Sequence, residues 1–155
     1  MRPLQEVNRR DAKGRLGVLF LCTGNSCRSQ MAEGWARRLK GDVIEPRSAG
    51  AKPKGLDRRA VKVMAEAGVD ISAQRSKHQD EFAGATFDYV VTLCDEARES
   101  CPIFPGKAKV IHRSFADPPR LAEGARTEEE ALAHYRRVRD EIRTFVEQMP
   151  DALNE

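Results

Sequence analysis

The chain has 155 residues, 27 basic and 24 acidic side chains, a net charge of +3 and 6% aromatic residues. This length fits one domain with a proper core, and basic residues that are scattered and nearly balanced by acidic ones argue against nucleic-acid binding. The longest apolar stretch, residues 18–21, is far shorter than the roughly 20 residues of a membrane-spanning helix. No apolar segment of signal-peptide length follows the basic N-terminus, so we expect a cytoplasmic protein without a membrane partner.

The first predicted elements follow a polar N-terminus. Residues 1–14 show no apolar periodicity, so we expect a flexible extension before a single domain at residues 15–150. The nearly continuous apolar run at 16–21 is typical of a buried parallel strand. After a turn-rich segment, apolar side chains that recur every four residues predict a helix at 28–41, which a glycine ends. A short second strand is predicted at 43–48.

The remaining elements alternate in the same way. A Gly/Pro-rich loop leads to a helix from Asp57, its predicted N-cap, to Ala67. Strands are predicted at 87–93 and 109–112, and a long amphipathic helix at 128–148. The apolar stripe of that last helix consists of Leu132, Tyr135, Val138, Ile142, Phe145 and Met149.

Strands that alternate with helices predict the α/β class. We expect a single three-layer domain with a four-stranded parallel sheet and helices on both faces. Binding sites in such sheets lie beyond the carboxyl ends of the strands. Cys22 and Cys94 each follow a strand directly, so they can face the same crevice if the first and third strands are neighbours.

The segment from Cys22 to Arg28 joins the first strand to the first helix. A loop of this size can curl so that its backbone N–H groups form a nest for an anion, and the following helix adds the positive end of its dipole. Arg28 can bind two oxygens of the anion at once. The same donors stabilise a thiolate at Cys22, which would make it a nucleophile. The alternative is a buried cysteine before a helix-capping loop.

The other residues of this loop have expected roles in holding it and the anion. Gly24 is expected to adopt a backbone angle that other residues avoid. The hydroxyls of Ser26 and Ser29 are expected to donate to the sulfur, and Asn25 to brace the backbone. The predicted oxyanion-binding residues are Thr23, Gly24, Asn25, Ser26, Cys27 and Ser29.

The sequence CTGNSCRSQMAEG at residues 22–34 resembles the signature of the low-molecular-weight protein tyrosine phosphatase superfamily. Within it, the sequence is most similar to the thioredoxin-coupled arsenate reductases, because Gln30 stands where phosphatases of this fold typically carry proline. The resemblance extends from about residue 16 to 147 and implies the low-molecular-weight phosphatase fold. The other matching segments are Ser48–Gly50, Val69–Ser72, Val91–Cys94, Asp117–Pro118 and Arg137–Ile142.

Cys94 and Cys101 distinguish a reductase from a phosphatase, which needs only the first cysteine. The resemblance implies a relay in which Cys94 attacks an arsenic adduct on Cys22 and Cys101 then attacks Cys94, leaving a disulfide that thioredoxin reduces. If Cys94–Cys101 begins as a helix, its ends lie about 10 Å apart along the axis. A disulfide needs Cα atoms within about 7 Å, so the segment must bend or unwind.

Other interpretations of the cysteines remain open. Cys94 and Cys101 can be ordinary buried thiols or half of a zinc site, although zinc favours pairs separated by two to four residues. No metal and no cofactor are predicted. The resemblance gives Cys27 no relay role, and we expect it to pack within the loop.

Two further positions take their interpretation from the resemblance. In the superfamily an Asp-Pro supplies the general acid, which places this role on Asp117; the alternative is a turn-forming Asp. The flanks differ, because Arg113 and Ala116 stand where the reductases have Trp and Asp.

Some relatives bind potassium through side chains that match Asn25, Glu33 and Ser48, but Lys77 stands at the position of a fourth ligand, an Asp. We therefore expect the ammonium of Lys77 to replace the potassium ion and pair with Glu33. An exposed, unpaired Lys77 is the alternative.

Taken together, these features predict a monomeric arsenate reductase with arsenate and thioredoxin as partners. Its predicted catalytic residues are Cys22, Cys94, Cys101, Arg28 and Asp117. A glutaredoxin-type donor is also possible. One alternative is a phosphatase of the same fold that forms a phosphocysteine at Cys22, and another is an oxyanion-binding or redox-sensing module without turnover.

Overall fold

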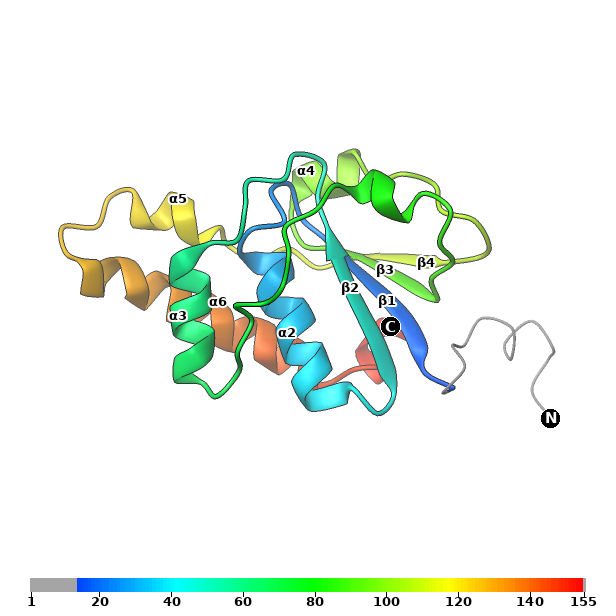
Figure 1. The fold of residues 1–155 in the computed structure, drawn as a ribbon, viewed down its shortest axis with the longest axis horizontal. Coiled ribbons are helices and arrows are strands. Elements are labelled where there is room, and N and C mark those ends of the chain that lie inside the picture. The colour runs from blue at the N-terminus through cyan, green and yellow to red at the C-terminus, as the bar shows by residue number, and fades with distance from the viewer. Residues whose placement is uncertain (1–13, 155) are drawn as a thin grey trace.

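The structure of the protein is a computed structural model, which describes residues 14–154 (Figure 1). Its predicted α/β class is confirmed: four parallel strands alternate with helices. The elements are β1 (Leu16–Leu21), α2 (Arg28–Lys40), β2 (Ile44–Ala49), α3 (Arg58–Glu66), a 3-10 helix (Gln79–Phe82), β3 (Tyr89–Thr92), α4 (Asp95–Glu99), β4 (Lys109–His112), α5 (Pro118–Ala122), α6 (Glu128–Glu147) and a final 3-10 helix (Asp151–Asn154).

The sheet has the strand order β2-β1-β3-β4, and each neighbouring pair runs parallel. At its centre, Phe20 of β1 lies in register with Ser48 of β2 and Val91 of β3. The predicted adjacency of the first and third strands is therefore confirmed. Because these strands run parallel, Cys22, directly after β1, and Cys94, two residues after the end of β3, emerge at the same edge of the sheet.

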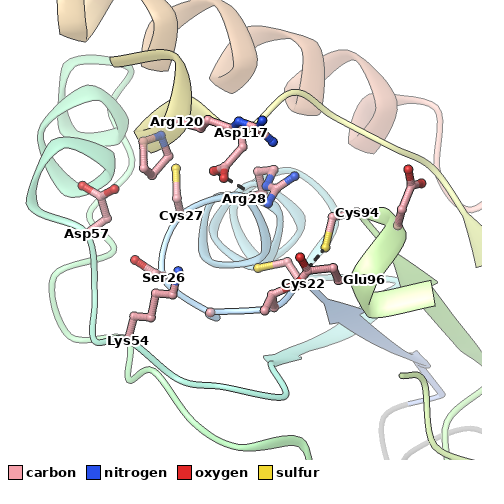
Figure 2. Close-up of a pocket in the computed structure, with 14 residues that line it drawn as sticks. Cys22, Ser26, Cys27, Arg28, Lys54, Asp57, Cys94, Glu96, Asp117 and Arg120 are labelled. Carbon is pink, nitrogen blue, oxygen red and sulfur yellow. Dashed lines mark hydrogen bonds and ion pairs between the residues drawn. The ribbon is translucent and has the colours of Figure 1, made fainter. Parts of the chain in front are cut away.

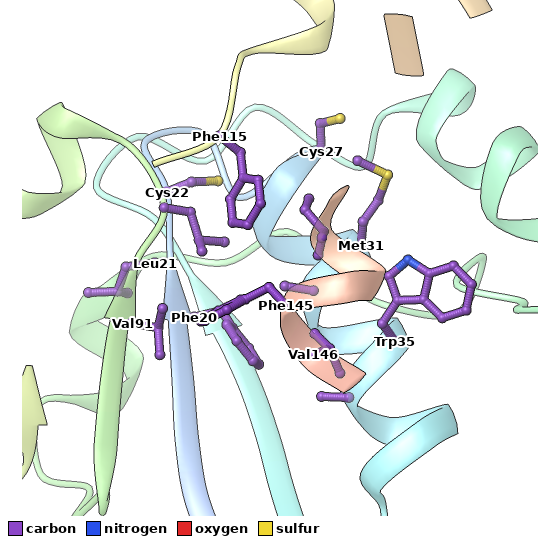
Figure 3. Close-up of a cluster of buried hydrophobic side chains, with 14 of the residues drawn as sticks. Phe20, Leu21, Cys22, Cys27, Met31, Trp35, Val91, Phe115, Phe145 and Val146 are labelled. Carbon is purple, nitrogen blue, oxygen red and sulfur yellow. The ribbon is translucent and has the colours of Figure 1, made fainter. Parts of the chain in front are cut away.

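The main core lies between the sheet and a layer of helices in which α2, α3 and α5 pack against α6. Figure 3 shows Phe20 of β1 pointing toward α6, which carries Phe145, and Met31 of α2 belongs to the same buried cluster. Trp35 is 2% exposed and donates its indole N–H to the backbone carbonyl of Arg139, which joins α2 to α6. In Figure 1, α4 and the first 3-10 helix lie on the other side of the sheet.

The predicted boundaries differ from the structure in small ways. The N-cap role of Asp57 is confirmed, because its carboxylate accepts from the N–H groups of Arg59 and Ala60. The packed chain continues past residue 150, since Leu153 is fully buried, and α5 was not predicted. The predicted extension at 1–14 lies outside the described residues except for Gly14. Among residues 14–154, none of the helices is both long and apolar enough to span a membrane.

Candidate active site

The anion loop, which we define as Cys22–Arg28, has its peptide groups held in a fixed direction. The backbone carbonyls of Thr23, Gly24 and Ser26 accept hydrogen bonds from the N–H groups of Lys52, Lys54 and Asp57, at 2.9, 3.0 and 3.1 Å. In a trans peptide, the carbonyl and the next N–H point in opposite directions. Turning these carbonyls toward the 52–57 segment therefore turns the amides that follow them toward the inside of the loop, as a nest for an anion requires.

Two residues give the loop its shape, and neither is Gly24. Asn25 has a φ of 44°, a left-handed conformation that asparagine tolerates better than most residues. The expectation that Gly24 supplies the unusual angle is wrong; Gly24 instead allows the Lys54 side chain to lie against it, where a Cβ would be 3.1 Å from Lys54 Cδ. A Cβ on Gly50 would lie 2.5 Å from the Thr23 carbonyl oxygen and 2.6 Å from that of Cys22. Only glycine fits there.

A buried hydrogen-bond network behind the loop directs one hydroxyl at the Cys22 sulfur. Asn25 Nδ2 donates to Ser29 Oγ at 2.8 Å, and Ser29 Oγ lies 2.9 Å from Cys22 Sγ. Because Ser29 accepts from Asn25, its own proton is available to the sulfur, where it would stabilise a thiolate. Gln30 Nε2 donates to Asn25 Oδ1 at 3.0 Å and so fixes the orientation of the asparagine amide.

The loop opens into a pocket of about 510 Å³ that contains most of the predicted site residues (Figure 2). Asn25 and Ser29 do not line it, since both are fully buried in the network behind the loop. Cys101 is also outside the lining. The lining residues are Cys22, Thr23, Gly24, Ser26, Cys27, Arg28, Lys54, Asp57, Cys94, Asp95, Glu96, Asp117, Pro119 and Arg120.

Arg28 and Asp117 meet at the rim of this pocket. Arg28 Nη1 donates to the carbonyl oxygen of Phe115 at 2.9 Å, and Arg28 Nη2 lies 3.7 Å from Asp117 Oδ1. Asp117 precedes α5 but makes no capping hydrogen bond with its side chain, so its carboxyl group remains available to the pocket. Arg113, one of the residues that departs from the resembled reductases, lies over the Phe145 ring with its guanidinium carbon 5.1 Å from the ring centre.

The second cysteine segment, Cys94–Cys101, begins inside the pocket and ends outside it. Cys94 is 8% exposed, and its sulfur lies 3.4 Å from the hydroxyl oxygen of Thr23 in the anion loop. Cys101 is half-buried; this partial burial raises the pKa of its thiol. All four cysteines are unbonded to one another. With α4 between them, Cys94 and Cys101 stand at opposite ends of a helical turn.

Comparison with known proteins places this chain in a family. Residues 17–155 match the family described as low molecular weight phosphotyrosine protein phosphatase. The chain belongs to this family. An arsenate reductase of Bacillus licheniformis is 52% identical over 125 residues, which are 81% of this chain and 88% of that protein.

Two solved structures have the same fold. An arsenate reductase of Archaeoglobus fulgidus has a TM-score of 0.63 and 30% identity, covering 85% of this chain and 97% of that one. A thioredoxin-dependent arsenate reductase of Corynebacterium glutamicum has a TM-score of 0.59 and 28% identity, covering 87% and 63%. The resemblance predicted from the sequence is confirmed, and so is the expectation of an enzyme of the arsenate reductase group.

In this member of the family, Cys27 lies on the side of the pocket away from Cys94 (Figure 2). Burial, with a further contribution from the Asp57 carboxylate, raises the pKa of the Cys27 thiol well above its usual value. The other oxygen of Asp57 accepts from the hydroxyl of Tyr135 at 2.7 Å; burial and this hydrogen bond raise the pKa of Tyr135. Cys27 is therefore held as a neutral thiol in the pocket that Cys22 also lines.

Lys77 lies where the sequence comparison predicted a replacement for potassium. Its side chain is 10% exposed, and its Nζ lies 3.7 Å from Glu33 Oε1 and donates to the Arg75 carbonyl at 2.9 Å. Glu33 also accepts from Ser48 Oγ at 2.5 Å. Burial lowers the pKa of Lys77. The interpretation of Lys77 as exposed and unpaired does not hold, whereas the absence of potassium binding stays a prediction. Within residues 14–154 there is no cluster of three or more His, Cys, Asp or Glu side chains placed to hold a metal.

Several residues of the site were not predicted. Lys54, Arg120 and Glu96 line the pocket with charged side chains, and Gly50 supports the loop from 22 residues beyond its end. Gly50 belongs to a segment that matched the family, which was the only available signal. The others lie in segments whose composition is typical of any solvated surface.

Proposed function

We propose that this chain is an arsenate reductase that works through three cysteines in succession, Cys22, Cys94 and Cys101. The observation that carries the proposal is that Cys94 lines the same pocket as Cys22 and Arg28. A phosphatase needs a nucleophile and an anion site, but it has no use for a second thiol at the bound oxyanion. A reductase needs that thiol to supply electrons.

In the first step, the thiolate of Cys22 attacks the arsenic atom of arsenate. The inward amides of the loop, the start of α2 and Arg28 hold the anion oxygens. Asp117, in its protonated form, gives a proton to the departing oxygen, which leaves as water. The product is an arsenic(V) group bound to the Cys22 sulfur. The Ser29 hydroxyl, 2.9 Å from that sulfur, stabilises the thiolate before the attack.

In the second step, the thiolate of Cys94 attacks the sulfur of Cys22. A sulfur–sulfur bond forms, the sulfur–arsenic bond breaks, and its electron pair reduces arsenic(V) to arsenic(III), which leaves as arsenite. The thiolate of Cys101 then attacks Cys94, which frees Cys22 and moves the disulfide to Cys94–Cys101. Because α4 separates these two cysteines, it must unwind for this bond to form.

The rim of the pocket favours a small inorganic anion over a phosphotyrosine side chain. Among residues 14–154, its lining includes Lys54, Asp57 and Arg120 but no aromatic side chain. The ring of a phosphotyrosine would therefore displace water from these charged groups and would find no aromatic surface to pack against. Hydrolysis of small phosphate esters at Cys22 remains the second candidate activity, since phosphate and arsenate have the same shape and charge.

We further propose thioredoxin as the electron donor and the cytoplasm as the location. Cys101 is half-buried, so the final disulfide would be accessible to a protein thiol. One structural neighbour is a thioredoxin-dependent arsenate reductase. A reducing compartment would also keep all four thiols free when the enzyme is at rest.

Arsenate turnover with thioredoxin, thioredoxin reductase and NADPH tests this function. We expect Cys94→Ser to release no arsenite. Cys101→Ser should release one equivalent per enzyme and then stop with Cys22 bonded to Cys94, as seen by mass spectrometry of the unreduced protein. Ser100→Ala, a change in the same segment that removes no thiol, should stay close to wild type. If both cysteine variants kept full turnover, the relay through Cys94 and Cys101 would be wrong. If the wild type released no arsenite but hydrolysed small phosphate esters, the phosphatase candidate would be favoured.

A further inference from the structure

We propose that Glu96 acts through the Thr23 hydroxyl to keep the proton on Cys94, so that the second thiol of the relay stays neutral until this contact breaks. Glu96 is a positioning residue in this scheme, because it reaches the sulfur only through Thr23. The purpose of the device rests on the relay proposed above, but the hydrogen-bond chain is a feature of the resting protein and can be measured without arsenate.

The direction of each hydrogen bond follows from the available protons. Thr23 Oγ1 lies 3.1 Å from Glu96 Oε2 and 3.4 Å from Cys94 Sγ. An ionised carboxylate only accepts, so the single hydroxyl proton of Thr23 is donated to Glu96. The hydroxyl oxygen can then only accept from the sulfur. Cys94 must supply the proton for that contact and is therefore held as a thiol.

The other charged groups near Cys94 are engaged elsewhere. Arg28 donates to the Phe115 carbonyl and lies beside Asp117. Asp95, next to Cys94 in the chain, lies 3.1 Å from Nε2 of His112 on β4.

Within residues 14–154, the Thr23 hydroxyl is the only hydrogen-bond partner of the Cys94 sulfur, which makes no capping bond with α4. Cys22 is the remaining titratable group of the anion loop on this side of the pocket, and its sulfur is bonded to Ser29. Glu96 is thus the charged group that the hydrogen bonds couple to Cys94.

Loss of the Glu96 contact would reverse the role of the hydroxyl. Thr23 could then rotate its proton toward Cys94 and stabilise a thiolate, and the displaced proton would pass to water at the open pocket. An oxyanion bound in the loop brings negative charge close to Glu96, and like charges repel. Substrate binding therefore favours departure of Glu96. Cys94 would become nucleophilic when the adduct that it must attack is present.

The test is the pH profile of Cys94 alkylation by iodoacetamide, followed by peptide mass spectrometry in a reduced Cys22→Ser background. The rate follows the thiolate fraction, so the midpoint of the profile reports ionisation, whereas the plateau at high pH reports accessibility. We expect Glu96→Ala to move the midpoint down by about one pH unit and to raise the rate at pH 7 about tenfold. Glu96→Gln should give a smaller shift, because its amide oxygen can still accept from Thr23.

Two controls separate this mechanism from a loosened helix and from general charge removal. Glu99→Ala removes a negative charge from the same helix and should leave the midpoint unchanged. In a Thr23→Val background, Glu96→Ala should no longer shift the midpoint, since the hydroxyl that couples the two residues is absent. The proposal is overturned if Glu96→Ala gives the wild-type midpoint, changes only the plateau, or shifts the midpoint equally with and without the Thr23 hydroxyl.

Because no arsenate is used, this outcome is independent of the relay. If Cys94→Ser kept full arsenate turnover while Glu96→Ala still shifted the midpoint, the proposed function would fail and the proton-holding contact would stand. If the relay held but the midpoint did not move, only the role of Glu96 would fail.

Discussion

The anion loop and the second cysteine segment lie on the same pocket but are held in different ways. The loop is supported by buried groups: Asn25 and Gln30 are fully buried, and Gly50 packs directly against its carbonyl groups. The second segment contains the five-residue helix α4, of which only Ala97 is buried. Side-chain contacts at its surface hold it in place, such as that of Gln79 Nε2 with the Ser100 carbonyl at 3.2 Å.

This difference fits the two tasks that the proposed mechanism assigns to these regions. Donors aimed at an oxyanion are effective only if they need no rearrangement when charge develops, so the loop benefits from being rigid. In the proposed relay, the Cys94 thiol must reach first Cys22 and then Cys101, so its segment needs a backbone that can leave its helical form. Segments with few buried contacts open at low free-energy cost, as this role requires.

The largest expected effect comes from Gly50→Ala, which attacks the rigidity of the loop. The added methyl group would lie 2.5 Å from the Thr23 carbonyl oxygen, so the loop must shift. We expect arsenate turnover to fall at least about 100-fold, because a displacement of about 1 Å of the groups that hold the substrate can lower the rate by that factor. The free energy of unfolding in urea should fall by about 1–3 kcal/mol.

Gly84→Ala is the matched control, because a Cβ there meets open space. It should change the free energy of unfolding by less than about 0.5 kcal/mol. Equal behaviour of the two variants would mean that the loop tolerates displacement and that its rigidity is unimportant.

Native-state hydrogen exchange compares the two regions directly. The amides of α2 after its first turn should be protected at least about 100-fold more than those of α4, because α2 is packed in the core and α4 is not. Oxidation to the Cys94–Cys101 disulfide should raise exchange in α4 and leave α2 unchanged. Equal protection of the two helices in the reduced protein would contradict the assignment of α4 as the mobile partner.

The reactivity of Cys27 gives a smaller effect inside the loop itself. Its pKa is raised by burial and by Asp57, so at pH 7 it holds its proton more firmly than a free thiol does. In a Cys22→Ser background we expect iodoacetamide to label Cys27 at least about tenfold more slowly than free cysteine. The rate should rise only at pH values above those where free cysteine is already ionised.

The labelling rate of Cys27 in an Asp57→Asn variant provides the comparison. Removal of the carboxylate charge should speed the reaction at pH 7, whereas burial of the thiol is retained. Labelling of Cys27 as fast as free cysteine in the parent protein would show that the thiol is neither buried nor held neutral.

The smallest expected effect is that of potassium. Lys77 Nζ lies 3.7 Å from Glu33 Oε1, so the lysine ammonium already supplies the positive charge that a potassium ion would supply there. Potassium and sodium at equal ionic strength should give the same arsenate turnover in the wild type. Lys77→Asp, which restores the acidic ligand of the potassium-binding relatives, should make turnover respond selectively to potassium. Clear selective activation of the wild type by potassium would contradict the interpretation that Lys77 replaces the ion.

The sequence alone determined the features that depend on neighbouring residues. The alternation of apolar runs and helical periodicity predicted the parallel sheet, because its central strands, β1 and β3, are buried and therefore read as nearly continuous apolar runs. The spacing from Cys22 to Arg28 predicted a loop between a strand and a helix, since all three are contiguous in the sequence. The capping role of Asp57 was predictable for the same reason.

The tertiary structure decided the contacts between segments distant in the chain. The packing of Gly50 against Thr23, the chain of bonds from Glu96 through Thr23 to Cys94, and the exposure of Asp57 to the pocket all depend on how separate segments meet. Because glycine tolerates unusual backbone angles, the sequence predicted such an angle at Gly24. In the structure, the left-handed backbone angle lies at Asn25 instead. Hydrogen bonds from the 52–57 segment hold the loop carbonyls, so the direction of each peptide group depends on a partner that is distant in the sequence.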